Sequence, residues 1–86
     1  MKVTFAEDAL KEYFEWQGQD KKTLKKINEL IKDIQRNGLA TGIGKPEPLK
    51  HIKAFSRKID DANRLVYIGN ESQDLEIISC KGHYED

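Results

Sequence analysis

The chain has 86 residues, and its 15 basic and 15 acidic side chains give a formal net charge of zero. A chain of this length is expected to form a single domain, residues 1–86, with a small core. The zero net charge argues against a general nucleic-acid coat protein. The one cysteine, Cys80, excludes an internal disulfide framework. With neither a signal peptide nor an apolar run long enough to cross a membrane, the chain is expected in the cytoplasm.

A short strand and a helix are predicted first. Polar and apolar residues alternate over 2–5, which is typical of a strand whose Val3 and Phe5 face the core. Apolar residues then recur at helical spacing over 7–16, and acidic residues in the first turn favour a helix that begins there. Gly18 is expected to end this helix.

An aromatic cluster, made of Tyr13, Phe14 and Trp16, lies in this first helix. Aromatic rings can stack on nucleic-acid bases, but three of them at helical spacing beside Leu10 are more often core residues. We therefore predict that all three are buried.

A second helix is predicted between Asp20, which suits an N-cap position, and the helix-ending pair Asn37-Gly38. Its apolar residues form one stripe: Leu24, Ile27, Leu30, Ile31 and Ile34. Most of its lysines lie off this stripe. The two helices are therefore expected to form an antiparallel hairpin with a lysine-rich outer side.

Glycine and proline recur in the segment that follows the second helix: Gly42, Gly44, Pro46 and Pro48. This composition forbids a helix and predicts an extended, constrained loop. Each proline fixes its own φ and biases the preceding residue toward an extended conformation. Lys45 and Glu47 are therefore expected on a stiff, extended backbone.

Three short strands are predicted in the second half of the chain: 54–59, 64–68 and 74–80. They are separated by turn-forming residues and are expected to form an antiparallel meander. The order of elements predicts an α+β fold, with a helical hairpin packed on a small twisted antiparallel β-sheet. Leu65 and Tyr67 share one face of their strand, and Arg64 lies on the other face. The sequence does not show which of the two faces is turned to the core. Cys80 is interpreted as a small strand residue, not a catalytic thiol.

Charge is segregated along the chain despite its zero sum. Residues 44–64 carry six basic and three acidic side chains, whereas the last 22 residues carry five acidic and one basic. The basic segment, which includes Arg57, can hold a polyanion, because each phosphate contact releases counterions. The alternative is an ordinary solvated face.

An acid, an arginine and a histidine in the second half of the chain form the candidate site: Glu47, Arg64 and His83. A carboxylate can take the proton from a ribose 2′-hydroxyl, a guanidinium can hold the attacked phosphate, and an imidazole can protonate the leaving 5′-oxygen. These steps need no metal or cofactor, so none is expected. The alternative is that Glu47 and Arg64 are surface charges and that His83 belongs to a frayed tail.

Five segments carry a family resemblance: Tyr13 to Gln17, Asp20 to Lys32, Gly42 to Lys50, Asn63 to Tyr67, and His83-Tyr84. Together and in this order they resemble the YoeB/Txe toxins of the RelE superfamily, over nearly the whole chain. The resemblance implies a microbial-RNase-like (RelE) fold. It also implies an endoribonuclease that cuts messenger RNA in the ribosomal A site and so inhibits translation.

Partners are implied by the same resemblance. They are a cognate YefM-type antitoxin, the 70S ribosome with its mRNA, and operator DNA, which is bound only by the toxin–antitoxin complex. No membrane partner is expected, and a homodimer is left open.

Residue roles also follow from the resemblance. The general base falls on Glu47, the phosphate-stabilising arginine on Arg64, the general acid on His83 and a substrate-orienting tyrosine on Tyr84. Three lysines are expected to contact the RNA: Lys45, Lys50 and Lys58.

The chain departs from the family pattern at three places. Lys58 stands where the family has a second arginine, the segment 52–55 is one residue shorter, and Glu85-Asp86 follow the final His-Tyr pair. They suggest one alternative, a catalytically weakened toxin. Two others also stay open: a non-enzymatic binder whose basic stretch docks on the ribosome or RNA, and a protein acting mainly in autoregulation with its antitoxin.

Overall fold

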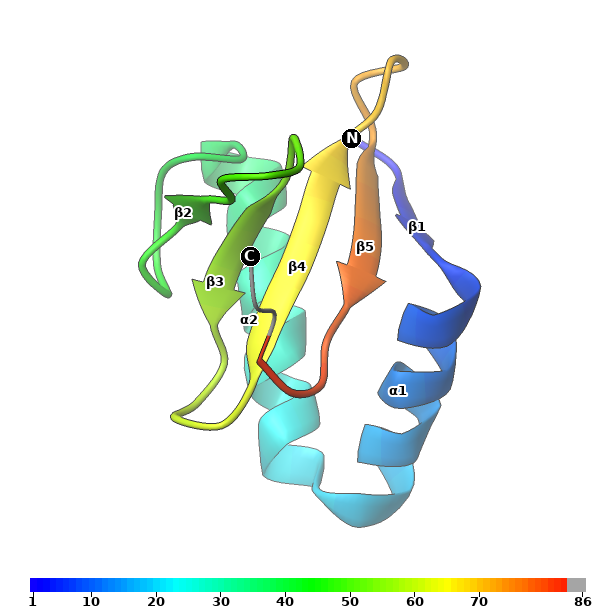
Figure 1. The fold of residues 1–86 in the computed structure, drawn as a ribbon. Helices are drawn as coiled ribbons and strands as arrows, with labels where there is room; N and C mark the ends of the chain where they lie inside the picture. The colour runs from blue at the N-terminus through cyan, green and yellow to red at the C-terminus, as the bar shows by residue number, and fades with distance from the viewer. Residues whose placement is uncertain (84–86) are drawn as a thin grey trace.

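The computed structural model of the protein describes residues 1–83. Its elements follow one another in the order β1 (Val3–Phe5), α1 (Glu7–Gln19), α2 (Lys21–Asn37), β2 (Glu47–Pro48), β3 (Phe55–Lys58), β4 (Arg64–Gly69) and β5 (Leu75–Ser79). The two helices run antiparallel and cover one face of a single sheet (Figure 1). The other face of the sheet is not covered by a helix, and we call it the open face.

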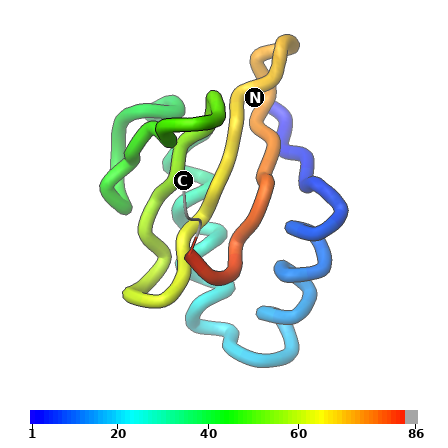
Figure 2. The backbone as a smooth tube through the Cα atoms, viewed as in Figure 1, coloured from blue at the N-terminus to red at the C-terminus, as the bar shows by residue number. Residues whose placement is uncertain are grey.

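The sheet has the strand order β1-β5-β4-β3-β2. Strands β3 to β5 form the predicted antiparallel meander. Strand β2, in the segment predicted as an extended loop, pairs antiparallel with β3, and β1 lies beside β5 and runs parallel to it (Figure 2). The predicted α+β class with its helical hairpin is therefore confirmed, but the sheet is mixed and not wholly antiparallel. Short hairpin turns impose antiparallel pairing on consecutive strands only. Both helices separate β1 from the meander in the sequence, so no short turn fixes the direction of β1. The packing of β1 against β5 and the helices sets that direction.

The helix boundaries differ from the prediction at one point. Helix α1 does not end at Gly18, as predicted, but continues through it to Gln19. A glycine costs a helix only about 1 kcal/mol, so it does not end one by itself. The chain changes direction at Asp20, whose carboxylate accepts hydrogen bonds from the backbone N–H groups of Lys22 and Thr23. The predicted N-cap is confirmed.

The aromatic cluster of α1 is only partly in the core. Trp16 is buried and Tyr13 packs against the core, but 56% of Phe14 is exposed. The prediction that Phe14 is buried was wrong. Ala9, Tyr13 and Trp16 are spaced by four and three residues and share the buried side of α1, whereas Phe14 is turned about 100° away from Tyr13.

The core fills the space between the helices and the sheet. Leu65 and Tyr67 of β4 belong to the core cluster, and Val3 and Phe5 of β1 pack against it as predicted. Val66 is equally buried but lies outside that cluster, on the open face. The structure thus assigns the two faces of β4 and places Arg64 on the open one.

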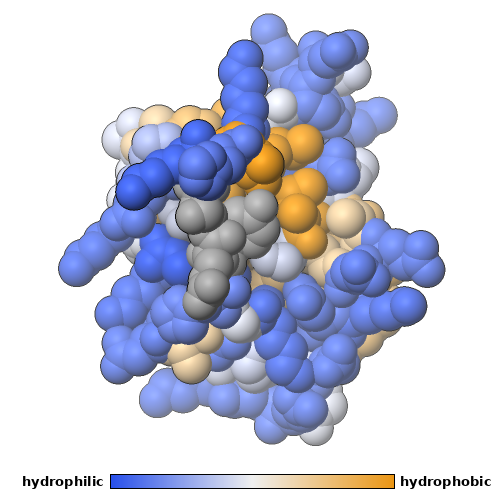
Figure 3. All heavy atoms as spheres, in the orientation of Figure 1, coloured by the Kyte–Doolittle hydropathy of each residue, from blue (hydrophilic) through white to orange (hydrophobic). Residues whose placement is uncertain are grey.

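A small apolar surface lies over β4 and β5 on the open face, between charged surfaces (Figure 3). No helix in the described part of the chain is both long and apolar enough to cross a membrane.

Candidate functional site

Glu47 and Arg64 meet on the open face although they lie on different strands. Glu47 of β2 pairs with Ser56 of β3, and Arg64 of β4 pairs with Lys58 of β3. Arg64 Nη2 lies 3.8 Å from Glu47 Oε2, and the two side chains are 19% and 66% exposed. Strand β3 therefore brings together a carboxylate open to solvent and a largely buried guanidinium.

The guanidinium of Arg64 is hydrogen-bonded at Nε, but within residues 1–83 its Nη2 has only the long contact with Glu47. Its Nε donates a 3.1 Å hydrogen bond to Ser56 Oγ. Its Nη2 is buried and has no hydrogen-bond partner among the described residues. A buried donor without a partner is unfavourable by about 1–3 kcal/mol, and an anion beside it would remove that penalty. The arrangement suits a phosphate or a carboxylate.

The third member of the candidate site is held at the start of β4. The imidazole Nε2 of His83 lies 2.9 Å from the carbonyl oxygen of Asp61, and the side chain is exposed. The preceding Gly82 donates its N–H to Asn63 Oδ1 and accepts from the N–H of Arg64. Figure 2 shows this segment (red) turning toward the start of β4 after β5. The chain up to His83 is therefore tied down and does not form a frayed tail.

Helix α1 also holds this C-terminal segment. Trp16 Nε1 donates to the carbonyl of Cys80, and Glu12 Oε1 accepts from the N–H of Cys80. Lys81 pairs with Glu15 at 2.8 Å. Burial raises the pKa of the Cys80 thiol to about 12, so it stays protonated at neutral pH. This agrees with the interpretation that Cys80 is not a catalytic thiol, although Cys80 is fully buried and follows β5 instead of lying within it.

Lys58 has a competing partner. Its Nζ lies 2.9 Å from a carboxylate oxygen of Asp61, and the hydrogen bond from Lys58 lowers the pKa of that carboxyl. Asp61 thus contacts Lys58 through its side chain and His83 through its backbone. Asp61 therefore competes with a substrate for both predicted site residues.

The other predicted contacts flank β2. Lys45 precedes the strand in the sequence, Lys50 follows it, and both are exposed. Lys45 has φ 54°, in the left-handed region, so the prediction of an extended residue before Pro46 was wrong. The loop packing upstream overrides the local preference of a residue that precedes proline. Tyr84 lies outside the described residues.

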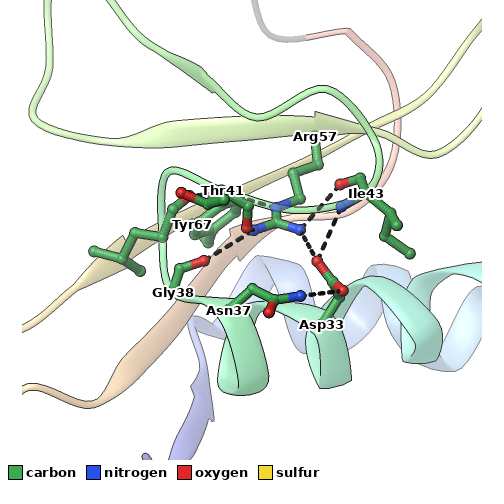
Figure 4. A network of polar contacts seen from close by, with 8 residues as sticks. Asp33, Asn37, Gly38, Thr41, Ile43, Arg57 and Tyr67 are labelled. Atoms are coloured by element: carbon green, nitrogen blue, oxygen red, sulfur yellow. Dashed lines mark hydrogen bonds and ion pairs between the residues drawn. The ribbon is translucent and has the colours of Figure 1, made fainter.

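Arg57, which the sequence placed in the polyanion-binding segment, is fully buried on the helix side of β3. It pairs with Asp33 at 2.6 Å and donates from Nε to Tyr67 Oη (Figure 4). Its remaining bonds go to three loop carbonyls: Gly38, Thr41 and Ile43. Arg57 thus adds no charge to the open face, although it was counted in the basic segment, because alternation along β3 turns it to the helix side.

This buried network fixes the loop that leads into β2. A side chain on Gly42, which has φ 128°, would collide with Asp33 Oδ2, so only glycine fits there. Gly44 accepts a 2.7 Å hydrogen bond from the N–H of Lys58. The hydrogen bond between Gly44 and Lys58 thus fixes the loop to β3 shortly before Glu47.

The sequence did not identify Ser56, Asp61 or Asn63 as site residues. Ser56 is one small polar residue in a strand and carries no spacing signal. Asp61 and Asn63 were interpreted only as turn formers, although such side chains often accept nearby backbone N–H groups. No group of three or more metal-ligating side chains that could hold a metal ion occurs within residues 1–83.

Comparison with known proteins gives one family. The model of the YoeB-like toxin of bacterial type II toxin–antitoxin systems matches residues 5–84. Toxin YoeB of Escherichia coli K12 is 46% identical over 86 residues, which cover 98% of this chain and 100% of that toxin.

Two solved structures of YoeB from Staphylococcus aureus agree with the fold. One, in a heterotetrameric complex with YefM, has 46% identity and a TM-score of 0.89, with 98% of each chain covered. The other, a YoeB dimer, has 45% identity and a TM-score of 0.90 at the same coverage. Sequence and fold agree over almost the full length, so the chain belongs to the YoeB family of toxins from bacterial type II toxin–antitoxin systems.

Proposed function

We propose that the chain is a metal-independent endoribonuclease that cleaves messenger RNA in the A site of the 70S ribosome and thereby inhibits translation. The observation that carries this proposal is the buried, unpartnered Nη2 of Arg64, 3.8 Å from the Glu47 carboxylate. A phosphodiester would supply the missing acceptor, and its neighbouring 2′-hydroxyl would supply a proton for the carboxylate. Membership of the YoeB toxin family supports the same reaction class.

The proposed reaction is an in-line transphosphorylation. Glu47 takes the proton of the 2′-hydroxyl, whose oxygen attacks the phosphorus. Arg64 stabilises the charge on the phosphorane-like transition state. His83 protonates the leaving 5′-oxygen, so that the P–O5′ bond breaks and a 2′,3′-cyclic phosphate remains. The proton that Glu47 gains is balanced by the proton that His83 loses.

Other residues have supporting roles in the proposal. Lys50 and Lys58 add positive charge near the phosphate, Lys45 contacts the RNA, and Tyr84 orients the substrate. Lys58 must exchange its partner Asp61 for the phosphate. The ribosome supplies the substrate geometry, since positioning accounts for a large share of such barriers. Cleavage of free RNA should therefore be weak.

The proposed partner is a YefM-type antitoxin. The S. aureus YoeB that resembles this chain was solved in complex with YefM, and another was solved as a dimer. We propose the same two kinds of assembly here, in the cytoplasm where the ribosomes are. With a net charge of zero, the chain is expected to bind operator DNA only within the toxin–antitoxin complex.

The test is to map RNA ends by primer extension in a reconstituted translation reaction. New ends at the A-site codon are expected with the unchanged chain. They should fall by about 10²–10⁴ with Glu47→Gln or His83→Gln, because each variant removes one proton-transfer group. Glu71→Gln removes an exposed carboxylate from the turn between β4 and β5 and serves as the matched control.

The same reaction separates the alternatives. Stalled translation without new RNA ends would identify a non-enzymatic binder. No effect on translation would identify a catalytically weakened toxin that acts mainly in autoregulation. Cleavage that persists in either site variant would remove the corresponding residue from the mechanism.

A further inference from the structure

Ser56 is a buried hydroxyl in the middle of the proposed site. It is 2% exposed and lies on strand β3. It pairs with Glu47 of β2 on one side and with Val66 of β4 on the other. Its neighbour Arg57 turns to the helix side, so Ser56 shares the open face with Glu47. Its Oγ accepts the 3.1 Å hydrogen bond from Arg64 Nε.

This bond restricts how Arg64 can present its donors. A guanidinium is planar, so fixing Nε fixes the plane in which the two terminal nitrogens lie. Because Ser56 occupies Nε, an incoming anion meets the terminal nitrogens, one of which is the unpartnered Nη2 near Glu47. Without this bond the long arginine side chain would sample several rotamers, and fewer of them would direct Nη2 toward the carboxylate.

We propose that Ser56 is a positioning residue for Arg64: its hydroxyl aims the guanidinium at the phosphate that is being attacked. The inference rests on the proposed ribonuclease function. Ser56 acts through Arg64 and does not itself contact the substrate. Donors fixed in place before the reaction stabilise the transition state most, so the loss should appear in kcat more than in KM.

The backbone at Ser56 does not depend on the hydroxyl. Residue 56 is held by strand pairing on both sides, to β2 and to β4. Ser56→Ala is therefore expected to keep the fold, which is checked by its urea midpoint. Ser79→Ala is the matched control, because Ser79 also pairs with Val66 and its side chain makes no hydrogen bond within residues 1–83.

The kinetic test is a double-mutant cycle in the A-site cleavage assay. Ser56→Ala should lower kcat by about ten- to a hundredfold, the range for losing a hydrogen bond to a charged group, with KM nearly unchanged. In the Arg64→Lys background it should cause no further loss, because lysine has no Nε to orient. An equal loss in both backgrounds, or no loss in either, would overturn the proposal.

A second test follows the Arg64 Nε–H directly by ¹⁵N NMR and needs no activity. The chain has three arginines, so Arg57 serves as a bonded internal reference and Arg36 as an exposed one. Ser56→Ala should speed solvent exchange of the Arg64 Nε–H toward that of Arg36, without changing Arg57. An Nε–H that already exchanges like Arg36 in the unchanged chain would overturn the proposal.

The two tests separate this inference from the function on which it rests. An unchanged chain that cleaves no mRNA but protects its Arg64 Nε–H would refute the ribonuclease proposal, and the role in catalysis with it. Cleavage by the unchanged chain, with additive losses in the cycle, would refute the positioning role alone.

Discussion

Arg57 and Arg64 lie on neighbouring strands and on opposite faces of the sheet, and their guanidinium groups differ in burial and in hydrogen bonding. On the helix side, Arg57 is fully buried and makes five hydrogen bonds, one of them to Asp33. On the open face, Arg64 has one hydrogen bond, to Ser56, and its buried Nη2 lies 3.8 Å from Glu47 without a hydrogen-bond partner among the described residues.

This difference indicates what each cation does. A buried charge whose donors are all engaged stabilises one arrangement of the chain around it. A partly buried charge with an unused donor is under-satisfied in the isolated protein and is completed by a ligand. We therefore interpret Arg57 as a residue of the fold, whereas Arg64 is a residue of the proposed site. Four experiments test this difference between the two arginines.

The largest effect is expected when Arg57 is removed. Arg57→Met leaves the buried Asp33 without its cation and frees three loop carbonyls, so the free energy of unfolding should fall by about 3–5 kcal/mol. Urea unfolding, followed by the fluorescence of the single tryptophan, Trp16, measures it. Lys53→Met, which removes an exposed cation, is the control and should change stability little. If Arg57→Met and Lys53→Met unfolded at the same urea concentration, Arg57 would not be a stabilising residue of the fold.

Removing Arg64 should give the opposite result. Arg64→Ala is expected to lower the rate of A-site cleavage by about 10²–10³, the range for losing one transition-state donor. The urea midpoint should change little, because an unsatisfied donor disappears with the side chain. A large loss of stability with normal cleavage by the folded fraction would make Arg64 a structural residue.

The pH dependence of stability should report the pairing of Arg57. The hydrogen bond from Arg57 lowers the pKa of Asp33 below its ordinary value of 3.8. The ionised carboxylate therefore stabilises the fold above about pH 4, and this contribution is lost as the pH falls through the lower folded pKa. Asp33→Asn should flatten the acid side of a stability profile measured by urea unfolding between pH 3 and 7. A profile as steep as that of the unchanged chain would argue against the pairing.

The smallest effect concerns Lys58 and Asp61. Their ion pair is exposed, so Asp61→Asn should leave the urea midpoint almost unchanged. If Lys58 contacts the phosphate, releasing it should raise cleavage by no more than about fivefold, because an exposed ion pair competes only weakly. Double substitution with Lys58→Ala should abolish the gain. Unchanged cleavage in Asp61→Asn would remove Lys58 from the RNA contacts.

The elements were predictable because their signals are local. The apolar stripe of α2, the Asp20 cap and the alternation in β4 each depend on residues close in sequence, and the structure confirms them. The end of α1 was less predictable, since Gly18 is a helix breaker only where tertiary structure or a cap favours an end.

The pairing of Glu47 with Arg64 illustrates the limit of sequence information about the site. Their residue types and the family resemblance were readable, but the 3.8 Å contact depends on β3 lying between β2 and β4. The roles of Ser56 and Arg57 depend on the same strand, because one residue of offset places them on opposite faces.

The α+β class, the helical hairpin, the three-stranded meander and the family were readable from the sequence, because periodicity, capping and motif order are properties of neighbouring residues. The parallel pairing of β1 with β5, the burial of Arg57 against Asp33, and the contact between His83 and Asp61 became visible only in three dimensions. Each of these contacts joins different segments of the chain. Whether they form depends on how the whole core packs, which no local pattern encodes.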